Sequence, residues 1–347
     1  MIIDHYNIQV KNGRCDEKGG NDLAVAVTGG AGFIGSHLVE TLLERGFYVT
    51  VIDDLSTGSL ENLESVLKNS RLKFIKGSIL DSSLLEDALK GCELVFHLAA
   101  SVGVKRIVDD PITTIRTNAV GTDNVLSAAV KNKSKKILIA SSSEVYGKSY
   151  GKPFRETDDL IFGPTYKARW SYGISKAIDE FLSLAYNSQG LINTIVIRFF
   201  NIVGERQTGA YGMVLPRFIE QALTGKPLTV YGNGEQVRTF CYVKDAVEAS
   251  LRLAQCETAQ GKVINLGSPY PIKIKDLAAL VKKTLNSKSE IKMVPYEDVY
   301  GAEFEDILYR VPDISLLKNL INYTPQTPLE QIITSISSNR RNTEASK

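Results

Sequence analysis

The sequence is poor in the side chains that build metal centres and hydrolytic triads. Its 347 residues include three histidines (His5, His37 and His97) and four cysteines, none of which forms a CxxC pair. A three-histidine metal site, a zinc-cysteine site or a Ser-His-Asp triad is therefore hard to assemble from this chain. We expect no metal ion, and any chemistry must use other side chains.

Long apolar runs and an excess of one charge are also missing. No segment approaches the roughly 18 apolar residues of a transmembrane helix, and the first residues carry Asp4, Asp16 and Glu17 without the apolar region of a secretory signal. Lysine and arginine number 41 against 39 aspartates and glutamates, which leaves a net charge of +2. We therefore expect neither nucleic-acid nor membrane partners, and the scattered cysteines fit a cytoplasmic location.

Short apolar runs alternating with amphipathic segments are what the chain does have. Strand-like runs lie at Leu23–Val27, Tyr48–Ile52, Leu72–Ile75, Leu94–His97, Lys136–Ala140 and Thr194–Phe199. Helical patterns lie between them, at Ser36–Arg45, Ser83–Leu89, Thr117–Val130 and Ser171–Tyr186. This alternation predicts an α/β fold with a doubly wound parallel sheet of the Rossmann type.

A glycine-rich segment directly follows the first predicted strand. Gly29, Gly32 and Gly35 stand in the run TGGAGFIGSHL, where glycines allow a tight turn and a close approach to a pyrophosphate at a helix N-terminus. Asp53 ends the second strand, where its carboxylate can accept hydrogen bonds from adenosine ribose hydroxyls and repel a 2′-phosphate. The combination predicts NAD as the cofactor rather than NADP.

The amino-acid composition changes after Phe200, where glycine and proline become frequent, and this change indicates a second structural unit. Leu228–Tyr231, followed by Gly-Asn-Gly, predicts a strand that enters a hairpin turn. Further helical patterns lie at Lys244–Ala254 and Ile274–Leu285. We expect a flexible tail at 1–22, an NAD-binding Rossmann domain at 23–200 with a returning segment at about 239–268, a smaller C-terminal α/β substrate lobe at 201–238 and 269–336, and a second tail at 337–347.

A catalytic tyrosine is predicted from the pair Tyr172 and Lys176. Four residues apart on a predicted helix, they share one face. The unperturbed pKa of tyrosine is about 10, and a nearby ammonium group stabilises the phenolate and lowers that value. Three serines, Ser141 to Ser143, end a predicted strand at the sheet edge where such folds bind ligands. These residues predict a site in which Tyr172 acts as the base.

The runs TGGAGFIGSHL, HLAAS, SSSEVYG, YGISK and RFFNIVG together resemble the extended short-chain dehydrogenases that modify nucleotide sugars, over about residues 23–335. The resemblance implies that Ser142 binds the substrate hydroxyl, and that the enzyme is a homodimer formed through the helices at Thr117–Val130 and Ser171–Tyr186. The expected cofactor contacts, besides those above, are Phe33, Ile34, Leu98, Ala99, Ala100, Asn118 and Phe199. The expected nucleotide-sugar contacts are Ser143, Asn201, Tyr231 and Arg238. Ser78 departs from the pattern, because many relatives carry Asp there toward the adenine.

Members of that group begin by oxidising the sugar at C4, and the 4-keto sugar is then epimerised, dehydrated or, for a glucuronic acid, decarboxylated. The 4,6-dehydratase is disfavoured, because the Asp of its Asp-Glu pair is Ser143 here and only Glu144 remains. A non-catalytic NAD-binding relative is disfavoured too, because such a protein is expected to have lost Tyr172 or Lys176.

The Ser143-Glu144 pair instead resembles UDP-glucuronate decarboxylases, including the lipid A-modifying decarboxylase domain. The segments Gly163–Tyr172 and Tyr300–Ile314 resemble the same enzymes. The resemblance implies that Arg310 meets the substrate carboxylate through charge-assisted hydrogen bonds and that Phe304 packs on the uridine. If Glu144 only holds a loop amide and Arg310 only binds the diphosphate, the alternative is a 4-epimerase of UDP-glucose, UDP-N-acetylglucosamine or UDP-glucuronate. UDP-glucuronate decarboxylase is the favoured interpretation.

Overall fold

The computed structural model describes residues 23–102, 110–149, 151–207, 213–296, 298 and 307–345. The predicted tail at 1–22 and the predicted uridine contact Phe304 lie outside the described residues. Among the helices described, none is long and apolar enough to cross a membrane.

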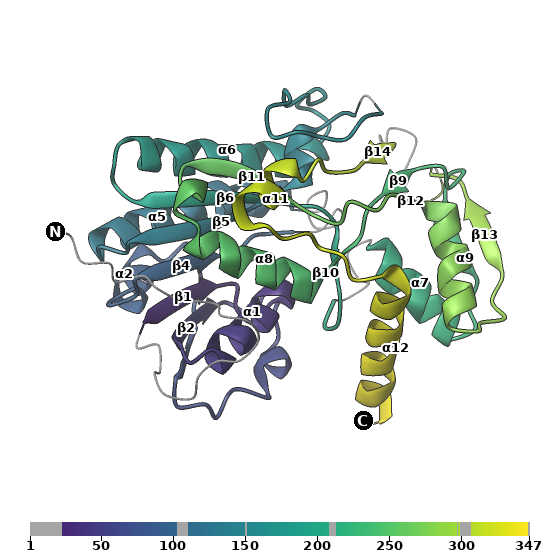
Figure 1. Ribbon diagram of the computed structural model, residues 1–347, viewed down its shortest axis with the longest axis horizontal. Helices are drawn as coiled ribbons and strands as arrows, with labels where there is room; N and C mark the ends of the chain where they lie inside the picture. Colours follow the sequence, from purple (N-terminus) through teal and green to yellow (C-terminus); the bar gives the residue numbers. More distant parts are fainter. Residues whose placement is uncertain are drawn as a thin grey trace.

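A seven-stranded parallel sheet forms the centre of the molecule (Figure 1), and its order is β11-β6-β5-β4-β1-β2-β3. Its strands are β1 (Ala24–Thr28), β2 (Tyr48–Asp53), β3 (Leu72–Lys76), β4 (Leu94–His97), β5 (Lys136–Ser142), β6 (Asn193–Phe199) and β11 (Lys262–Leu266). The strand order reverses beside β1, between β2 and β4, and in such sheets ligands bind in the crevice at the carboxyl ends of the strands on either side of that point. The predicted doubly wound sheet is confirmed.

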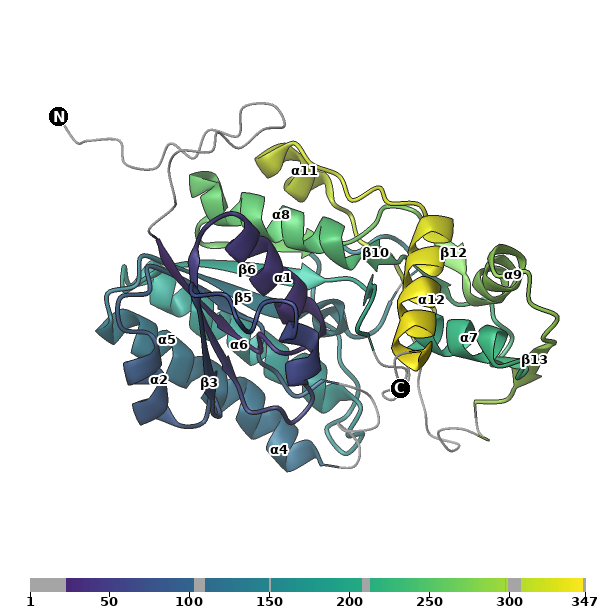
Figure 2. The same ribbon diagram turned by 90° about the horizontal axis from the view of Figure 1, so that it is seen from below.

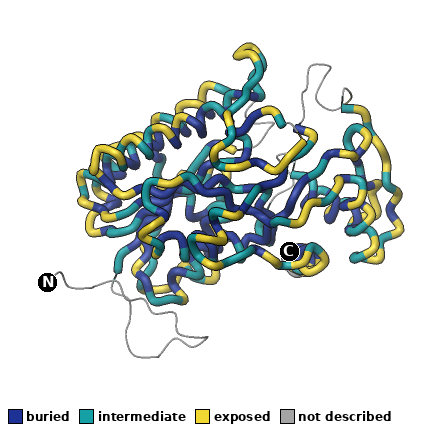
Figure 3. Tube along the Cα trace, turned by 45° about the horizontal axis from the view of Figure 1, so that its top comes forward, coloured by how far each residue is buried: buried dark blue, intermediate teal, exposed yellow. Residues whose placement is uncertain are grey.

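Helices cover both faces of the sheet, as Figure 2 shows. One face carries α1 (Phe33–Glu44), α8 (Val243–Gln255) and α11 (Ser315–Ile321), and the other carries α2 (Ser82–Ala88), α5 (Gly121–Lys131) and α6 (Trp170–Ser188). Successive residues of β6 point to opposite faces, so that Ile195 and Ile197 belong to one buried cluster and Val196 to the other. The strands are therefore buried on both sides, which the dark trace through the middle of Figure 3 makes visible.

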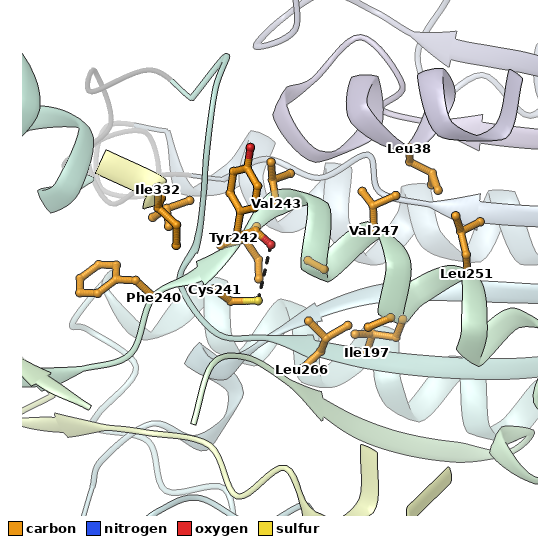
Figure 4. Packing of buried hydrophobic residues seen from close by; sticks show 14 of the residues in the cluster. Leu38, Ile197, Phe240, Cys241, Tyr242, Val243, Val247, Leu251, Leu266 and Ile332 are labelled. Carbon is orange, nitrogen blue, oxygen red and sulfur yellow. Dashed lines mark hydrogen bonds between the residues drawn. The ribbon is translucent and has the colours of Figure 1, made fainter. Parts of the chain in front are cut away.

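The packing around α8 joins the sheet to its covering helices (Figure 4). Val247 and Leu251 lie one helical turn apart, and both belong to the cluster that contains Leu38 of α1, Ile197 of β6 and Leu266 of β11. This cluster extends into the C-terminal lobe through further buried side chains. The lobe is thus held against the sheet by one continuous apolar core.

The C-terminal lobe, on the right of Figure 1, contains α7 (Val214–Leu223), α9 (Ile274–Thr284) and α12 (Leu329–Ala345). Its strands are β8 (Leu228–Tyr231) with β13 (Ile291–Val294), and β9 (Val237–Arg238) between β12 (Ile272–Lys273) and β14 (Tyr309–Arg310). The short remaining elements are β7 (Ile202–Val203), β10 (Cys241–Tyr242), α4 (Pro111–Ile115), the π-helical η2 (Arg116–Val120) and the 3₁₀ turns η1 (Leu60–Leu63), η3 (Ser143–Tyr146) and η4 (Glu257–Ala259).

The hairpin predicted after Leu228–Tyr231 is wrong. Gly232 and Gly234 do turn the chain, with φ angles of 65° and 70°. The chain then continues into β9, which pairs with β12 and β14, while β8 pairs in parallel with the distant strand β13. The turn residues were identified correctly, but strand pairing is decided by long-range partners that a local pattern does not reveal.

The tail predicted from residue 337 is also wrong, because α12 continues through Ser337 to Ala345. Ile332, Ile333 and Ile336 are buried and recur at helical spacing, so one stripe of α12 packs against the lobe. The second half of the helix is polar in sequence, and it is helical as a continuation of the anchored first half.

Candidate active site

A cavity of about 2170 Å³ opens at the carboxyl ends of the central strands and extends along the C-terminal lobe. Pockets for one small ligand typically measure about 300–1,000 Å³, so this volume suits a dinucleotide together with a second nucleotide. Of the residues predicted from the sequence, the cavity is lined by Gly29, Gly32, Phe33, Ile34, Gly35, Asp53, Leu98, Ala99, Ala100, Ser142, Ser143, Glu144, Tyr172, Phe199, Asn201 and Arg310. Ser78 lies on the same wall.

The glycine-rich loop forms a tight cradle at one end of the cavity. Gly29 has a φ angle of +71°, and a Cβ there would lie 2.7 Å from the backbone nitrogen of Ala99. A Cβ at Gly35 would lie 2.1 Å from the carbonyl oxygen of Gly29. Helix α1 begins directly after Gly32 without a side-chain cap. Its first amides therefore face the cavity as donors for an anionic group such as a pyrophosphate.

Asp53 closes the cradle from the end of β2. Its Oδ2 accepts a hydrogen bond from the amide of Ala31 at 2.9 Å, and its Oδ1 accepts one from the amide of Leu55 at 2.8 Å. Burial raises the pKa of this carboxyl group, and the two amides oppose that rise. The carboxylate thus fixes the conformation of the loop and also lines the cavity. Its contact with a ribose stays a prediction.

His97, at the end of β4, is a packed histidine. Its Nδ1 shares a hydrogen bond with Thr28 Oγ1 at 2.7 Å, and its Nε2 shares one with Thr122 Oγ1 at 3.0 Å. Burial, with a smaller contribution from Lys176, lowers the pKa of His97 to about 3. The ring is therefore neutral and serves as a link between strands and α5.

Asn118 lies behind the cavity wall rather than on it. Its Oδ1 accepts a hydrogen bond from the amide of Ser101, and its Nδ2 donates one to Ser175 Oγ, both at 2.9 Å. The neighbouring Thr117 lines the cavity instead. Asn118 thus ties the loop after β4 to α6, and its role as a direct cofactor contact stays a prediction.

Tyr172 projects from the first turn of α6 into the cavity beside Ser142. Burial raises the pKa of its phenol above the ordinary value, and the negative charges of Glu144 and Asp179 add to that rise. The hydrogen bond with Ser142 and the charge of Arg310 lower it. The surroundings of Tyr172 therefore favour the protonated phenol, and its predicted role as the base stays a prediction.

Lys176 is almost fully buried one turn further along α6. Its Nζ donates a hydrogen bond to Asp179 Oδ2 at 2.6 Å, and both side chains are shielded from solvent. Lys176 does not line the cavity itself. Asp179 was missed in the sequence, although its position three residues after Lys176 on one helix was a usable signal. Whether Lys176 contacts the cofactor, as the resemblance implies, stays a prediction.

Glu144 is surrounded by arginines. It contacts Arg310 Nη1 through its Oε1, and Arg169 Nη2 lies 3.6 Å from its Oε2. Burial alone raises the pKa of Glu144, but the charges of Arg310, Arg169 and Arg238 together bring it below the usual range. Arg310 Nη2 also donates a hydrogen bond to Asn201 Oδ1 at 2.8 Å. The structure thus brings together Glu144 and Arg310, which are distant in the sequence.

Two of the predicted substrate contacts, Tyr231 and Arg238, do not line the cavity. Arg238 on β9 is buried and acts on the charge of Glu144. The ring of Tyr231 lies 3.9 Å from the guanidinium carbon of Arg217, which does line the cavity. The sequence analysis did not identify Arg217 or α7, because they lie in the segment after Phe200 where glycine and proline are frequent. Pro216 is in the first turn of α7, where proline is tolerated because its missing amide is not needed.

Residues 25–267 match the family model described as "NAD dependent epimerase/dehydratase family". The chain belongs to this family. Among its relatives is the UDP-N-acetyl-alpha-D-glucosaminuronate decarboxylase of Bacillus cytotoxicus, 46% identical over 306 residues that cover 88% of this chain and 94% of the relative. Another is UDP-glucuronic acid decarboxylase 4 of Arabidopsis thaliana, 35% identical over 89% of this chain and 66% of the relative.

A solved structure of the same type is the UDP-glucuronic acid 4-epimerase of Bacillus cereus in complex with UDP-glucuronic acid and NAD. It is 29% identical, covers 92% of this chain and 100% of its own, and superposes with a TM-score of 0.81. The chain is thus an NAD-dependent enzyme of the epimerase/dehydratase family. Its own residues fit NAD, because the glycine cradle leaves no room for side chains and the first turn of α1 has no side-chain cap. No group of three or more histidine, cysteine or carboxylate ligands for a metal occurs among the described residues.

Proposed function

We propose that this enzyme decarboxylates a UDP-linked hexuronic acid through a 4-keto intermediate. The observation that carries the proposal is the cluster of Glu144 with Arg310 and Arg169 beside Tyr172, whose charged side chains are 22%, 16% and 11% exposed. A carboxylate taken from water into such a site needs a cationic partner, and Arg310 is such a partner on the cavity wall. The relatives from Bacillus cytotoxicus and Arabidopsis, both named as decarboxylases of UDP-uronates, support the same assignment.

The roles of the residues follow from their positions. Tyr172 accepts the proton of the C4 hydroxyl, and Ser142 holds that hydroxyl by a hydrogen bond. NAD, when bound, supplies the oxidation of C4 and its later reversal. The 4-keto uronate is a β-keto acid, so its C5–C6 bond breaks with loss of carbon dioxide, and the electron pair forms an enolate. Tyr172 and Ser142 donate hydrogen bonds to the enolate oxygen, and C5 takes a proton from solvent to give the 4-keto pentose. Tyr172 returns its proton to the C4 oxygen when the ketone is reduced.

The substituent at C2 of the sugar distinguishes the two candidate substrates. The relative at 46% identity is named for a 2-acetamido uronate, and the relative at 35% is named for glucuronate. Both UDP-glucuronate, which was favoured from the sequence, and UDP-N-acetylglucosaminuronate therefore belong in the assay. We test the 2-acetamido uronate first, because it is the named substrate of the more similar relative.

The test is incubation of the enzyme with NAD and each UDP-uronate, followed by mass spectrometry. A product lighter by one carbon dioxide supports the proposal. A product of unchanged mass that separates chromatographically from the substrate overturns it in favour of a 4-epimerase. That alternative has its own support in the 4-epimerase of Bacillus cereus, which resembles this chain over nearly its full length.

Replacing Arg310 by glutamine should lower kcat/KM for the UDP-uronate by at least about 30-fold, since loss of one partner of a hydrogen-bonded charge pair that substrate binding shields from water costs about 2–5 kcal/mol. Arg252→Gln is the matched control, because Arg252 lies on the outer part of α8 and pairs with Glu248 on the same helix. Initial rates with a series of substrate concentrations measure the effect. Equal kcat/KM in both variants would remove Arg310 from the proposed mechanism.

We further propose a homodimer formed through α6 and the helical segments that pack beside it. Five large apolar side chains are exposed on these elements, and they are Ile112, Ile115, Val120, Ile178 and Phe181. Such a concentration of exposed apolar residues is typical of a protein interface. We also propose a cytoplasmic location. Cys92, Cys241 and Cys256 are free thiols, and free thiols persist in a reducing compartment.

Phe181 is 71% exposed in the single chain, so Phe181→Asp should convert the dimer into a monomer by placing a charge in an apolar interface. Light scattering coupled to size-exclusion chromatography measures the mass. Leu308→Asp, at an exposed position of the other lobe, should leave the dimer intact. A monomeric unsubstituted protein, or a dimeric Phe181→Asp variant, would contradict this interface.

A further inference from the structure

Two opposite charges lie together on the buried side of α6. Asp179 follows Lys176 by three residues, and its Oδ2 accepts a hydrogen bond from Lys176 Nζ at 2.6 Å. The exposed fractions of the two side chains are 2% for the lysine and 0% for the aspartate. Neither residue lines the cavity. This ion pair, called the buried pair below, is thus closed off from solvent.

Two uncharged polar side chains lie near the buried pair on neighbouring elements. Burial raises the pKa of Asp179, whereas Lys176 and the hydroxyl of Thr122 on α5 lower it. Thr122 also shares a hydrogen bond at 3.0 Å with Nε2 of His97 on β4. The His97 ring carries no charge, because burial and the charge of Lys176 lower its pKa to about 3. Neither neighbour can neutralise an ammonium group.

The other charged groups on and around this part of α6 have partners of their own. Glu180 accepts two hydrogen bonds from Arg198 of β6, at 2.9 and 2.7 Å. Glu144 belongs to the turn η3, which packs against α6, and it contacts Arg310. These carboxylates are therefore neutralised by arginines, and the two charges of the buried pair are left to neutralise each other.

The stability of the fold does not explain the buried pair. Both ions lose their hydration on burial, and replacing such a pair by apolar side chains of similar volume is often neutral or stabilising. A buried ammonium group without a counter-ion is still less favourable, and it tends to lose its proton. A neutral lysine cannot stabilise a phenolate. The carboxylate of Asp179 is thus best explained by a requirement for a charged Lys176.

We propose that Asp179 is a positioning residue that keeps Lys176 protonated and fixes its ammonium group one helical turn from Tyr172. The inference rests on the proposed function, in which Tyr172 is the base. Burial, Glu144 and Asp179 itself raise the pKa of the Tyr172 phenol, so a charged lysine is needed to oppose them. Lys176 starts one turn from Tyr172 and Asp179 starts two turns away, so the cation is the better placed of the two charges.

The protonation of Lys176 can be measured through the unfolding of the full-length enzyme without added NAD. In Asp179→Asn the lysine should be neutral in the folded state and charged in the unfolded state. The unfolded state then binds one proton more, so stability rises with pH. Relative to the unsubstituted enzyme, the unfolding equilibrium constant of this variant should fall about tenfold per pH unit between about pH 7.5 and 9.5. Urea titrations at a series of pH values measure it.

The chain offers a matched control on its surface. Asp87 and Lys90 form an ion pair with the same spacing and the same distance of 2.6 Å, but both side chains are exposed. The difference in stability between Asp87→Asn and the unsubstituted enzyme should therefore stay constant over this pH range. Asp179→Glu keeps the carboxylate of the buried pair, and its difference should be constant as well.

The kinetic consequence is a change in the pH dependence of turnover. With NAD and a UDP-uronate, Asp179→Asn should lower kcat at pH 7 by at least about tenfold, because a phenolate without a nearby ammonium group forms at higher pH. The rise in activity should move to higher pH by at least about one unit. Asp179→Glu should recover most of this shift. A disturbed packing alone would lower kcat by the same factor at every pH.

Two outcomes would overturn the inference. If the stability difference of Asp179→Asn does not change with pH, Lys176 keeps its proton without Asp179. If the pH dependence of kcat is unchanged, the buried pair does not act on Tyr172. Should Asp179→Asn not fold at pH 7, its combination with Lys176→Met decides, because the uncompensated charge is then removed and folding should return. A combined variant that also fails to fold would contradict the proposal.

Failure of the proposed function is distinguishable from failure of this inference. The unfolding experiment needs no substrate, so it reports on the buried pair whatever reaction the enzyme catalyses. If the proposed function is wrong, the unsubstituted enzyme releases no carbon dioxide from either UDP-uronate.

Discussion

Replacing Tyr172 by phenylalanine should lower kcat by about 10²- to 10⁴-fold, the usual contribution of a positioned proton-transfer group. The phenol is the titratable hydroxyl that faces the cavity next to Ser142, and phenylalanine keeps its packing. Turnover numbers at saturating substrate measure the loss, and thermal unfolding confirms that the variant is folded. A variant that keeps more than about a tenth of the turnover would exclude Tyr172 as the base.

A matched control lies on the same helix. Tyr186, also on α6, shares a hydrogen bond at 2.9 Å with Ser127 Oγ and does not line the cavity. Tyr186→Phe therefore removes one phenolic oxygen from α6 without touching the site, and its turnover should stay within about twofold of the unsubstituted enzyme. A large loss in both variants would indicate a disturbed helix rather than a lost base.

The pH dependence of the reaction gives a second readout for Tyr172. Only the phenolate can accept the C4 proton, and burial together with Glu144 and Asp179 raises the pKa of the phenol. Activity should therefore rise with pH and fall as the phenolate is protonated at lower pH. The positive charge of bound NAD lowers the pKa of the phenol, so the rise in activity should occur closer to neutral pH. In Tyr172→Phe the residual activity should not show this rise with pH.

The central sheet was largely predictable from local patterns. Leu94–His97 was identified with the bounds of β4, and Tyr48–Ile52 differs from β2 by one residue. These strands are buried on both faces, so nearly every position is apolar and the run itself marks the element. The nucleotide-binding loop was predictable for a similar reason, since close backbone approach at Gly29 and Gly35 leaves glycine as the one residue type that fits.

The C-terminal lobe was predicted less well, because its elements depend on partners far away in the chain. β8 pairs with β13 and β9 with β14, and neither pairing follows from local sequence. The same holds for the site. Glu144 and Arg310 are 166 residues apart, so the sequence could suggest each of them but not their contact. Arg169 was not identified in the sequence either, because its position three residues before Tyr172 does not reveal its approach to Glu144.

Of the substitutions that replace one glycine of the cofactor loop by alanine, Gly35→Ala should lower the affinity for NAD most. A Cβ at this position would lie 2.1 Å from the carbonyl oxygen of Gly29 and 2.8 Å from Cα of Gly30. Both are backbone atoms, so no side chain can move aside and α1 must shift away from the loop. Overpacking of this kind costs about 1–3 kcal/mol, which for a chain of this length corresponds to a fall in Tm of about 1–4 °C.

The displaced helix also carries the amides that face the cavity. The affinity for NAD should therefore fall by more than about tenfold, equivalent to 1.4 kcal/mol, and the rise in Tm that NAD produces should shrink accordingly. Gly190→Ala is the matched control. Gly190 has a φ angle of +69°, and a Cβ added there would meet no other atom within 4 Å, so this variant reports backbone strain without loop contact. Normal NAD affinity in Gly35→Ala would show that the cradle is looser than its contacts indicate.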